Sequence, residues 1–165
     1  ELEAAYDWLA RCVKTMDPEI VTDEIIDNMA QGRKALGLCY SGDATYIMSE
    51  NEDMGFYLPK EGTNLWYDSM VIPSNAKNVA LAHEFINYVS SYEAAYDNSS
   101  YVGYTSPNQI VMDELSRGDG DYAGINAYLP RSGYDKDEVF VYNEETRKII
   151  SNLWSKVKIT ASNAN

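Results

Sequence analysis

Apolar residues recur with the spacing of an α-helix in several stretches of the chain. The first stretch ends at Asp17, because the ring of Pro18 disfavours helix in the residue before it. The second is capped by Thr22 or Asp23 and stops at Gly32. Short helices are also predicted over 92–97 and 110–115. The apolar sides of the longer helices are Leu2, Tyr6, Leu9, Val13 and Met16, then Ile25, Ile26 and Met29, then Val79, Ala82, Phe85, Ile86 and Val89. The last helix is expected to have a buried stripe of Ile149, Ile150, Leu153, Trp154 and Val157.

Three apolar stretches have the length and composition of strands. Residues 35–40, ALGLCY, form a run typical of a buried strand, and residues 54–58 form a second. A turn over 59–62 leads into the third, which continues to Ile72. Because these strands alternate with the helices, the sequence predicts an α/β fold with a mostly parallel sheet.

The end of the first predicted strand is a candidate site for ligand contacts. Tyr40, Ser41 and Asp43 stand at a tight turn that leads into a short helix over 44–50. Open α/β sheets place ligand contacts at such turns. A plain turn between a strand and a helix fits the same residues, so both interpretations stay open.

The third predicted strand places an aromatic ring beside a carboxylate. Side chains alternate between the two faces of a strand, so Trp66 and Asp68 project to one face and Tyr67 and Ser69 to the other. An aromatic face beside an unpaired carboxylate suits a cation, and an amine in particular. A buried Trp66 with Asp68 at the start of a turn is an equally good interpretation of the residues alone.

The chain is strongly acidic, which excludes some classes of partner. It has 165 residues, 26 acidic against 13 basic, and a net charge of −13. Such a chain repels phosphate backbones and anionic lipids and attracts cations, so nucleic acid is not an expected partner. Its length and its 45% hydrophobic content fit one globular domain or two small lobes.

No constellation of catalytic or metal-binding residues stands out. His83 lies near the polar face of its predicted helix, with no catalytic partner at the right spacing. Cys12 and Cys39 lack metal-ligand spacing and read as buried free thiols, with a disulfide between them as the alternative. Asp119 and Asp121 do not continue into a calcium-binding loop. We therefore expect no enzyme, no cofactor and no metal.

The ends of the chain suggest a piece of a longer protein. The start is acidic and amphipathic, unlike a signal segment, so either the protein is cytoplasmic or its targeting segment has been removed. No cap residue precedes the helical pattern at Glu1, which favours a chain cut from something longer. Residues 160–165 are expected to be a flexible tail.

Several motifs in the same order resemble the spermidine/putrescine-binding proteins of bacterial polyamine ABC transporters. The resemblance is close from Glu1 to about Asn108 and loose beyond. The motifs that carry it are ELEAAYDWLA over 1–10, GLCYSGDA over 37–44, LPKEG over 58–62, LWYDS over 65–69, VIP over 71–73, NAKN over 75–78, ALAHEFINYVSS over 80–91, VGYTSPN over 102–108 and LWSKVK over 153–158.

The resemblance implies a fold and a division into lobes. The family's proteins have a type II periplasmic-binding-protein fold of two lobes that close on the ligand, and this chain corresponds to roughly the second half. Residues 1–65 and 113–165 would belong to the second, C-terminal lobe, and residues 66–112 to the first, with the connecting strands as the hinge. The missing N-terminal half of the same protein would complete the site.

The resemblance also implies the residues that contact the ligand. The family's Trp-x-Asp falls on Trp66 and Asp68, its Gly-Tyr ring on Tyr104, and its aromatic residue after the apolar strand on Tyr40. Phe140 falls nearest to the family's late glutamine, so the chain departs from the pattern there.

The implied function is the capture of polyamines, spermidine or putrescine, outside the cytoplasm. The expected partners are an ABC transporter permease and the missing half of the protein, and the chain by itself could form a homodimer. The implied location is periplasmic or, for a membrane-anchored form, extracellular. The alternatives are a binding protein for a sugar or another cation, an acidic protein-interaction domain, and a hydrolase whose catalytic half is missing.

Overall fold

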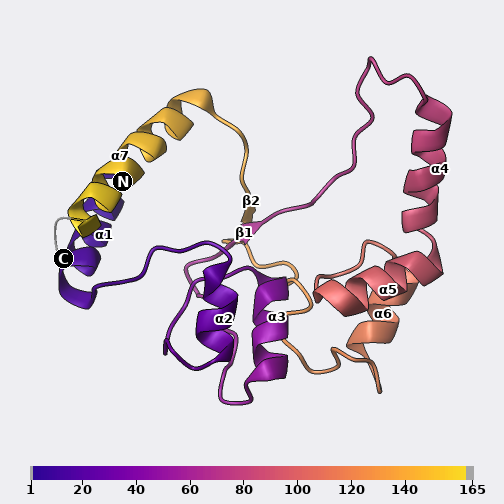
Figure 1. Ribbon diagram of the computed structural model, residues 1–165, viewed down its shortest axis with the longest axis horizontal. Helices are drawn as coiled ribbons and strands as arrows, with labels where there is room; N and C mark the ends of the chain where they lie inside the picture. The colour runs from indigo at the N-terminus through magenta and orange to yellow at the C-terminus, as the bar shows by residue number, and fades with distance from the viewer. Residues whose placement is uncertain (1, 163–165) are drawn as a thin grey trace. The chain divides into compact units, whose positions relative to one another are not determined.

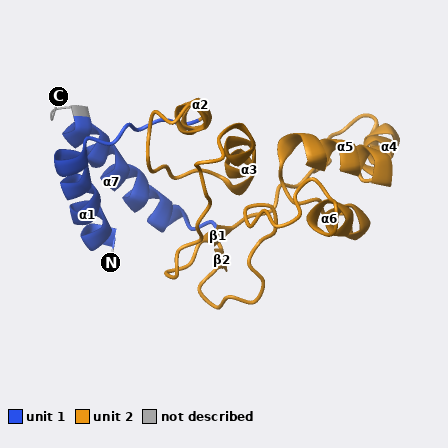
Figure 2. Ribbon diagram, turned by 90° about the horizontal axis from the view of Figure 1, so that it is seen from below, with its two compact units in different colours: residues 1–22, 140–165 blue, residues 23–139 orange. Residues whose placement is uncertain are grey.

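The computed structural model describes residues 2–162, which form two compact units (Figure 2). Of the described residues, one unit contains 2–22 and 140–162, and the other contains 23–139. This division follows the contacts within the chain. The two lobes expected from the family resemblance belong to a whole binding protein, so they stay a prediction.

The smaller unit is a pair of helices. Helix α1 spans Leu2–Met16 and helix α7 spans Glu144–Ser162, and the two pack against each other (Figure 1). Helix α1 ends at Met16, as the proline at position 18 predicts, and Asp17 has a φ of 47°. Val13 and Val157 are buried in this unit.

Two predictions for the last helix are corrected. Ile149, Ile150 and Trp154, expected in a buried stripe, are 40–49% exposed, because α1 covers only part of that face. The helix also continues beyond the predicted start of the flexible tail, since residues 160–162 are helical. The rest of that tail lies outside the described residues.

The larger unit contains five helices among its described residues. Their bounds are α2 Glu24–Ala30, α3 Ser41–Glu50, α4 Val79–Val89, α5 Tyr92–Val102 and α6 Gln109–Ser116. Helices α4 and α6 have asparagine caps, because the side chains of Asn78 and Asn108 accept hydrogen bonds from backbone N–H groups of the first turn. The bounds of these helices confirm the positions that apolar periodicity predicts, with α5 longer than expected.

The core of this unit lies between α5, α6 and an irregular segment. It consists of Ala95, Val111, Leu115 and Tyr128, and the last three are at most 1% exposed. The Tyr122 ring stacks on the Tyr128 ring at 4.6 Å. The packing thus fixes the segment after α6, although that segment has no regular secondary structure.

The sheet is much smaller than the sequence predicts. Strand β1, Asn64–Leu65, pairs in parallel with strand β2, Glu138–Val139, with Asn64 opposite Glu138 (Figure 1). The strands predicted over 35–40 and 54–58 are absent, and Leu36 and Leu38 are 83% and 98% exposed. A strand needs a neighbour for its backbone hydrogen bonds, and the described residues supply none for these segments. The α/β prediction therefore holds only for one parallel pair in a mostly helical chain.

Both cysteines are free thiols and are half-buried, so the disulfide alternative is not formed. His83 is exposed on α4, as expected. None of the helices in residues 2–162 is long and apolar enough to cross a membrane.

The buried core of the larger unit gives a test of this fold. We expect Leu115→Ala to lower the free energy of unfolding by about 2–5 kcal/mol, because it opens a cavity at a fully buried position. Ile110→Ala is the matched control, since Ile110 lies on the same helix and is 67% exposed, and it should change stability by only about 0.5 kcal/mol. Urea denaturation of both variants measures the difference. Equal losses would contradict the assignment of Leu115 to the core.

Candidate functional site

Three of the four predicted ligand contacts come together in one aromatic cluster. The Trp66 ring lies between the rings of Tyr40 and Tyr104, with centroid distances of 5.8 Å and 5.4 Å. Both contacts are edge-to-face, at interplanar angles of 74° and 67°. Tyr40 is 63% exposed and Trp66 is 39% exposed. The cluster therefore presents aromatic surface to solvent.

The three rings come from three separate parts of the larger unit. Tyr40 directly precedes α3, Trp66 directly follows β1, and Tyr104 lies in the loop after α5. The buried Ser99 of α5 donates a hydrogen bond to the backbone carbonyl of Tyr104, which holds this loop against the helix. The ends of these short elements thus determine the positions of the three rings.

The Tyr104 ring lies directly on Gly42. A Cβ atom at Gly42 would stand 2.2 Å from Cε2 of the ring, far inside van der Waals contact. Gly42 is buried in the first turn of α3. A glycine at this position is therefore what allows the ring to reach Trp66.

Asp43 adds a carboxylate to the cluster. The Tyr104 hydroxyl donates a hydrogen bond to Oδ1 of Asp43, at 3.3 Å. Burial is the first cause that raises the pKa of Tyr104, and the charge and hydrogen bond of Asp43 add to it, bringing the pKa to about 12. The phenol therefore stays protonated at neutral pH and remains a donor. Asp43 keeps its second oxygen for another donor.

The turn after the first predicted strand pointed to Asp43 as a candidate for ligand contact, whereas the family resemblance did not include it among the contact residues. Its place in the first turn of α3, three residues after Tyr40, was the available signal. What the sequence could not show is that Tyr104, distant along the chain, meets this turn.

Asp68, the fourth predicted contact, is exposed in an irregular segment. Strand β1 ends at Leu65, so the alternation that would place Trp66 and Asp68 on one face is not formed. The structure records no ion pair of Asp68 with any of residues 2–162. The placement of Asp68 beside the cluster therefore remains a prediction.

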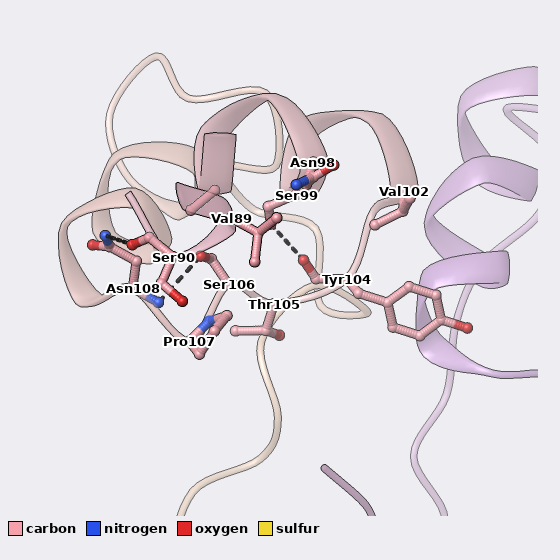
Figure 3. Close-up of a pocket in the computed structure, with 11 residues that line it drawn as sticks. Val89, Ser90, Asn98, Ser99, Val102, Tyr104, Thr105, Ser106, Pro107 and Asn108 are labelled. Atoms are coloured by element: carbon pink, nitrogen blue, oxygen red, sulfur yellow. Dashed lines mark hydrogen bonds between the residues drawn. The ribbon is translucent and has the colours of Figure 1, made fainter. Parts of the chain in front are cut away.

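A cavity of about 380 Å³ lies on the other side of the Tyr104 loop (Figure 3). Neutral side chains line it, among them Val89, Asn98, Ser99, Val102 and Pro107. The Tyr104 ring points away from this cavity, toward α3 (Figure 3). Since its lining has no charged side chain, the cavity does not suit an ammonium ligand, and the aromatic cluster is the stronger candidate.

The described part of the chain contains no group of three or more His, Cys, Asp or Glu side chains that could hold a metal ion. The cluster is made of rings and one carboxylate. Ring faces and a carboxylate are groups that can hold a cation, through cation–π contact and charge-assisted hydrogen bonds.

Comparison with known proteins assigns the chain to a family. Residues 1–117 match the family described as bacterial extracellular solute-binding protein. The chain belongs to this family. The matched residues include all three rings of the cluster and Asp43. Since the family's members bind solutes and are not enzymes, the expectation that the chain is no enzyme is confirmed.

Named relatives of this solute-binding family bind polyamines. The chain is 32% identical over 119 residues to the "Spermidine/putrescine-binding periplasmic protein" of Salmonella typhimurium and, equally, to that of Escherichia coli strain K12; each match covers 70% of this chain and 33% of the relative. It is 24% identical over 149 residues to the "Putrescine-binding periplasmic protein PotF" of Escherichia coli, covering 83% of this chain and 38% of the relative. The chain thus spans about a third of the length of these relatives. No solved structure matches it significantly.

The hydrogen bond between Tyr104 and Asp43 predicts a pH effect. Since the raised pKa favours the protonated phenol in the folded state, folding stability should fall as pH rises from 10 to about 12. Asp43→Asn should lower the pKa of Tyr104, although burial will keep it above its ordinary value. NMR of ring-labelled tyrosine, with Tyr104→Phe for assignment, measures the midpoint. Asp119→Asn, which removes an exposed carboxylate elsewhere, is the control. An unchanged midpoint in Asp43→Asn would contradict the hydrogen bond.

Proposed function

We propose that the chain is part of the solute-binding component of an ABC importer and that it binds polyamines. The observation that carries this proposal is the position of the Trp66 ring between Tyr40 and Tyr104. Asp43 adds a carboxylate there, because it accepts a hydrogen bond from the Tyr104 hydroxyl. The printed names of the relatives support the choice of ligand.

A polyamine matches the chemistry of the aromatic cluster. It is a chain of methylene groups between ammonium groups, so a site for it needs apolar walls along the chain and carboxylates at the charged ends. The exposed parts of Trp66 and Tyr40 supply walls. Asp43 and Asp68 supply carboxylates, and the net charge of −13 raises the concentration of cations near the site.

Binding works by closure of two lobes rather than by catalysis. In the whole protein, residues 1–65 and 113–165 belong to one lobe and residues 66–112 to the other. Trp66 then stands at the crossing between them, and the rest of the protein completes the site. The partner is the permease of the importer, and the protein works outside the cytoplasm, as the family's description suggests.

Removal of the central ring is the first test. In the full-length protein, Trp66→Ala should weaken spermidine or putrescine binding by about 1–3 kcal/mol, since it removes a cation–π wall and apolar contact. Titration calorimetry measures the loss. Tyr67→Ala is the matched control, because Tyr67 is the next residue and is 78% exposed. Unchanged affinity in a folded Trp66→Ala protein would move the site elsewhere. Heat from a neutral sugar, with none from polyamines, would favour the alternative solute.

The carboxylate at position 68 is the second test. Asp68→Asn keeps the size of the side chain and removes its charge, so a bound ammonium loses its partner and affinity should fall by about 2–5 kcal/mol. Stability should change much less, since Asp68 is exposed and faces water in the free protein. Asp119→Asn, another exposed carboxylate of the larger unit, is the control. A variant that loses stability but keeps polyamine affinity would show that Asp68 serves the fold.

A further inference from the structure

Two irregular segments of the larger unit are joined by a dense set of polar contacts, which we call the clasp. The clasp consists of the turn over 59–63 and the segment over 131–138. Its centre is a bidentate ion pair, in which Arg131 donates from Nε to Oδ2 of Asp137, at 2.9 Å, and from Nη2 to Oδ1. The Asp137 side chain is 1% exposed and that of Arg131 is 24% exposed. This pair is therefore far more shielded than a surface ion pair.

The ion pair is bonded directly to the turn. The backbone N–H of Thr63 donates to Oδ1 of Asp137, at 2.9 Å, and Arg131 donates from Nη2 to the carbonyl of Pro59, at 3.2 Å. The guanidinium also lies over the Tyr134 ring, 3.7 Å from its centroid, and the Tyr134 hydroxyl donates to the carbonyl of Lys60, at 2.7 Å. The clasp thus satisfies backbone groups of the turn that regular secondary structure leaves open.

The close fit extends to the backbone. At Gly62, φ is 105°, and a Cβ atom there would stand 2.0 Å from the carbonyl oxygen of Lys136. Only glycine meets both conditions, since it adopts positive φ without strain and has no side chain to clash. The Glu138 N–H donates to the carbonyl of Thr63, at 3.0 Å. Strand β1 begins at Asn64, the residue directly after the turn.

The clasp leads directly to the central ring of the aromatic cluster. Strand β1 is two residues long and Trp66 follows it. Two strands of this length cannot fix a side chain by their own hydrogen bonds. The direction in which the chain enters Trp66 is therefore set by Thr63, which the clasp holds from both its N–H and its carbonyl.

We propose that Arg131 and Asp137 are positioning residues that set the place of Trp66 between Tyr40 and Tyr104 and so determine affinity at that site. The proposal rests on the function proposed above for the cluster, but its central step, the coupling of the clasp to the Trp66 ring, is measured without ligand. Neither residue is one of the rings of the aromatic cluster, and their hydrogen bonds and ring contact are with the turn, Tyr134 and each other.

The test combines a signal from Trp66 with binding, in the full-length protein labelled with fluorotryptophan. The fluorine resonance of Trp66 is assigned by its loss in Trp66→Phe. We expect Asp137→Ala to shift or broaden this resonance and to weaken spermidine binding by about tenfold, since small displacements of a positioned group cost this much or more. Arg131→Lys keeps the charge but loses the planar guanidinium that bonds both oxygens of Asp137. Asp137→Asn keeps an acceptor for the Thr63 N–H. Both variants should therefore give smaller changes in the same direction.

The matched control is Asp113→Ala, which removes the carboxylate of the exposed Arg117–Asp113 pair of the same unit, at 3.0 Å. It should leave the Trp66 resonance and the affinity unchanged. If Asp137→Ala does not fold, Arg131→Lys and Asp137→Asn decide instead, by the change in the Trp66 resonance and in spermidine affinity. A Trp66 resonance that stays in place while thermal stability falls overturns the proposal, because the clasp is then structural only. Failure of the unmodified protein to bind any polyamine overturns instead the function proposed for the cluster.

Discussion

The buried hydroxyl of Ser99 joins the core of the larger unit to the aromatic cluster. It has one proton, which it donates to the carbonyl of Tyr104, so the bond of 2.8 Å to Tyr128 is donated by the Tyr128 hydroxyl. Thr105 in turn donates to the carbonyl of Tyr128. A buried hydroxyl without partners costs about 1–3 kcal/mol, so these bonds make the core and the loop after α5 stabilise each other. This constraint fixes the backbone at Tyr104, whose ring lies on Gly42.

The helices could be predicted from the sequence because their signals are local. The spacing of Leu2, Tyr6, Leu9 and Val13 and the break at Pro18 lie within one segment, and α1 has those bounds. A strand depends on its neighbour, and no pattern within residues 35–40 can show whether that neighbour is present. The exposure of Leu36 and Leu38 in the described chain reflects this dependence. Tyr128 was missed as a core residue for a related reason, because an irregular segment has no periodicity to read.

The candidate site was predictable to a similar extent. Tyr40, Trp66 and Tyr104 were found through motifs, and the structure brings their rings together. The bond between Asp43 and Tyr104 and the contacts of the clasp were not predicted, because they join distant parts of the chain. Thr63 and Asp137 are separated by 74 residues, and Tyr104 and Asp43 by 61. Such pairs carry no periodic signal, and only a folded structure shows them.

The charge of Asp43 connects the electrostatics of the cluster to its proposed ligand. Burial is the first cause of the raised pKa of Tyr104 and of the Cys39 thiol, and the charge of Asp43 adds to both. The negative field of Asp43 therefore acts on Tyr104, whose ring contacts Trp66, and on Cys39, which precedes Tyr40 in the chain. An ammonium group bound at Asp43 would offset this field and lower both pKa values. By linkage, a cation that lowers the pKa of Tyr104 must bind more tightly when that phenol is ionised. At neutral pH the phenol is protonated, so the carboxylate alone supplies the charge, and the hydroxyl serves to orient it.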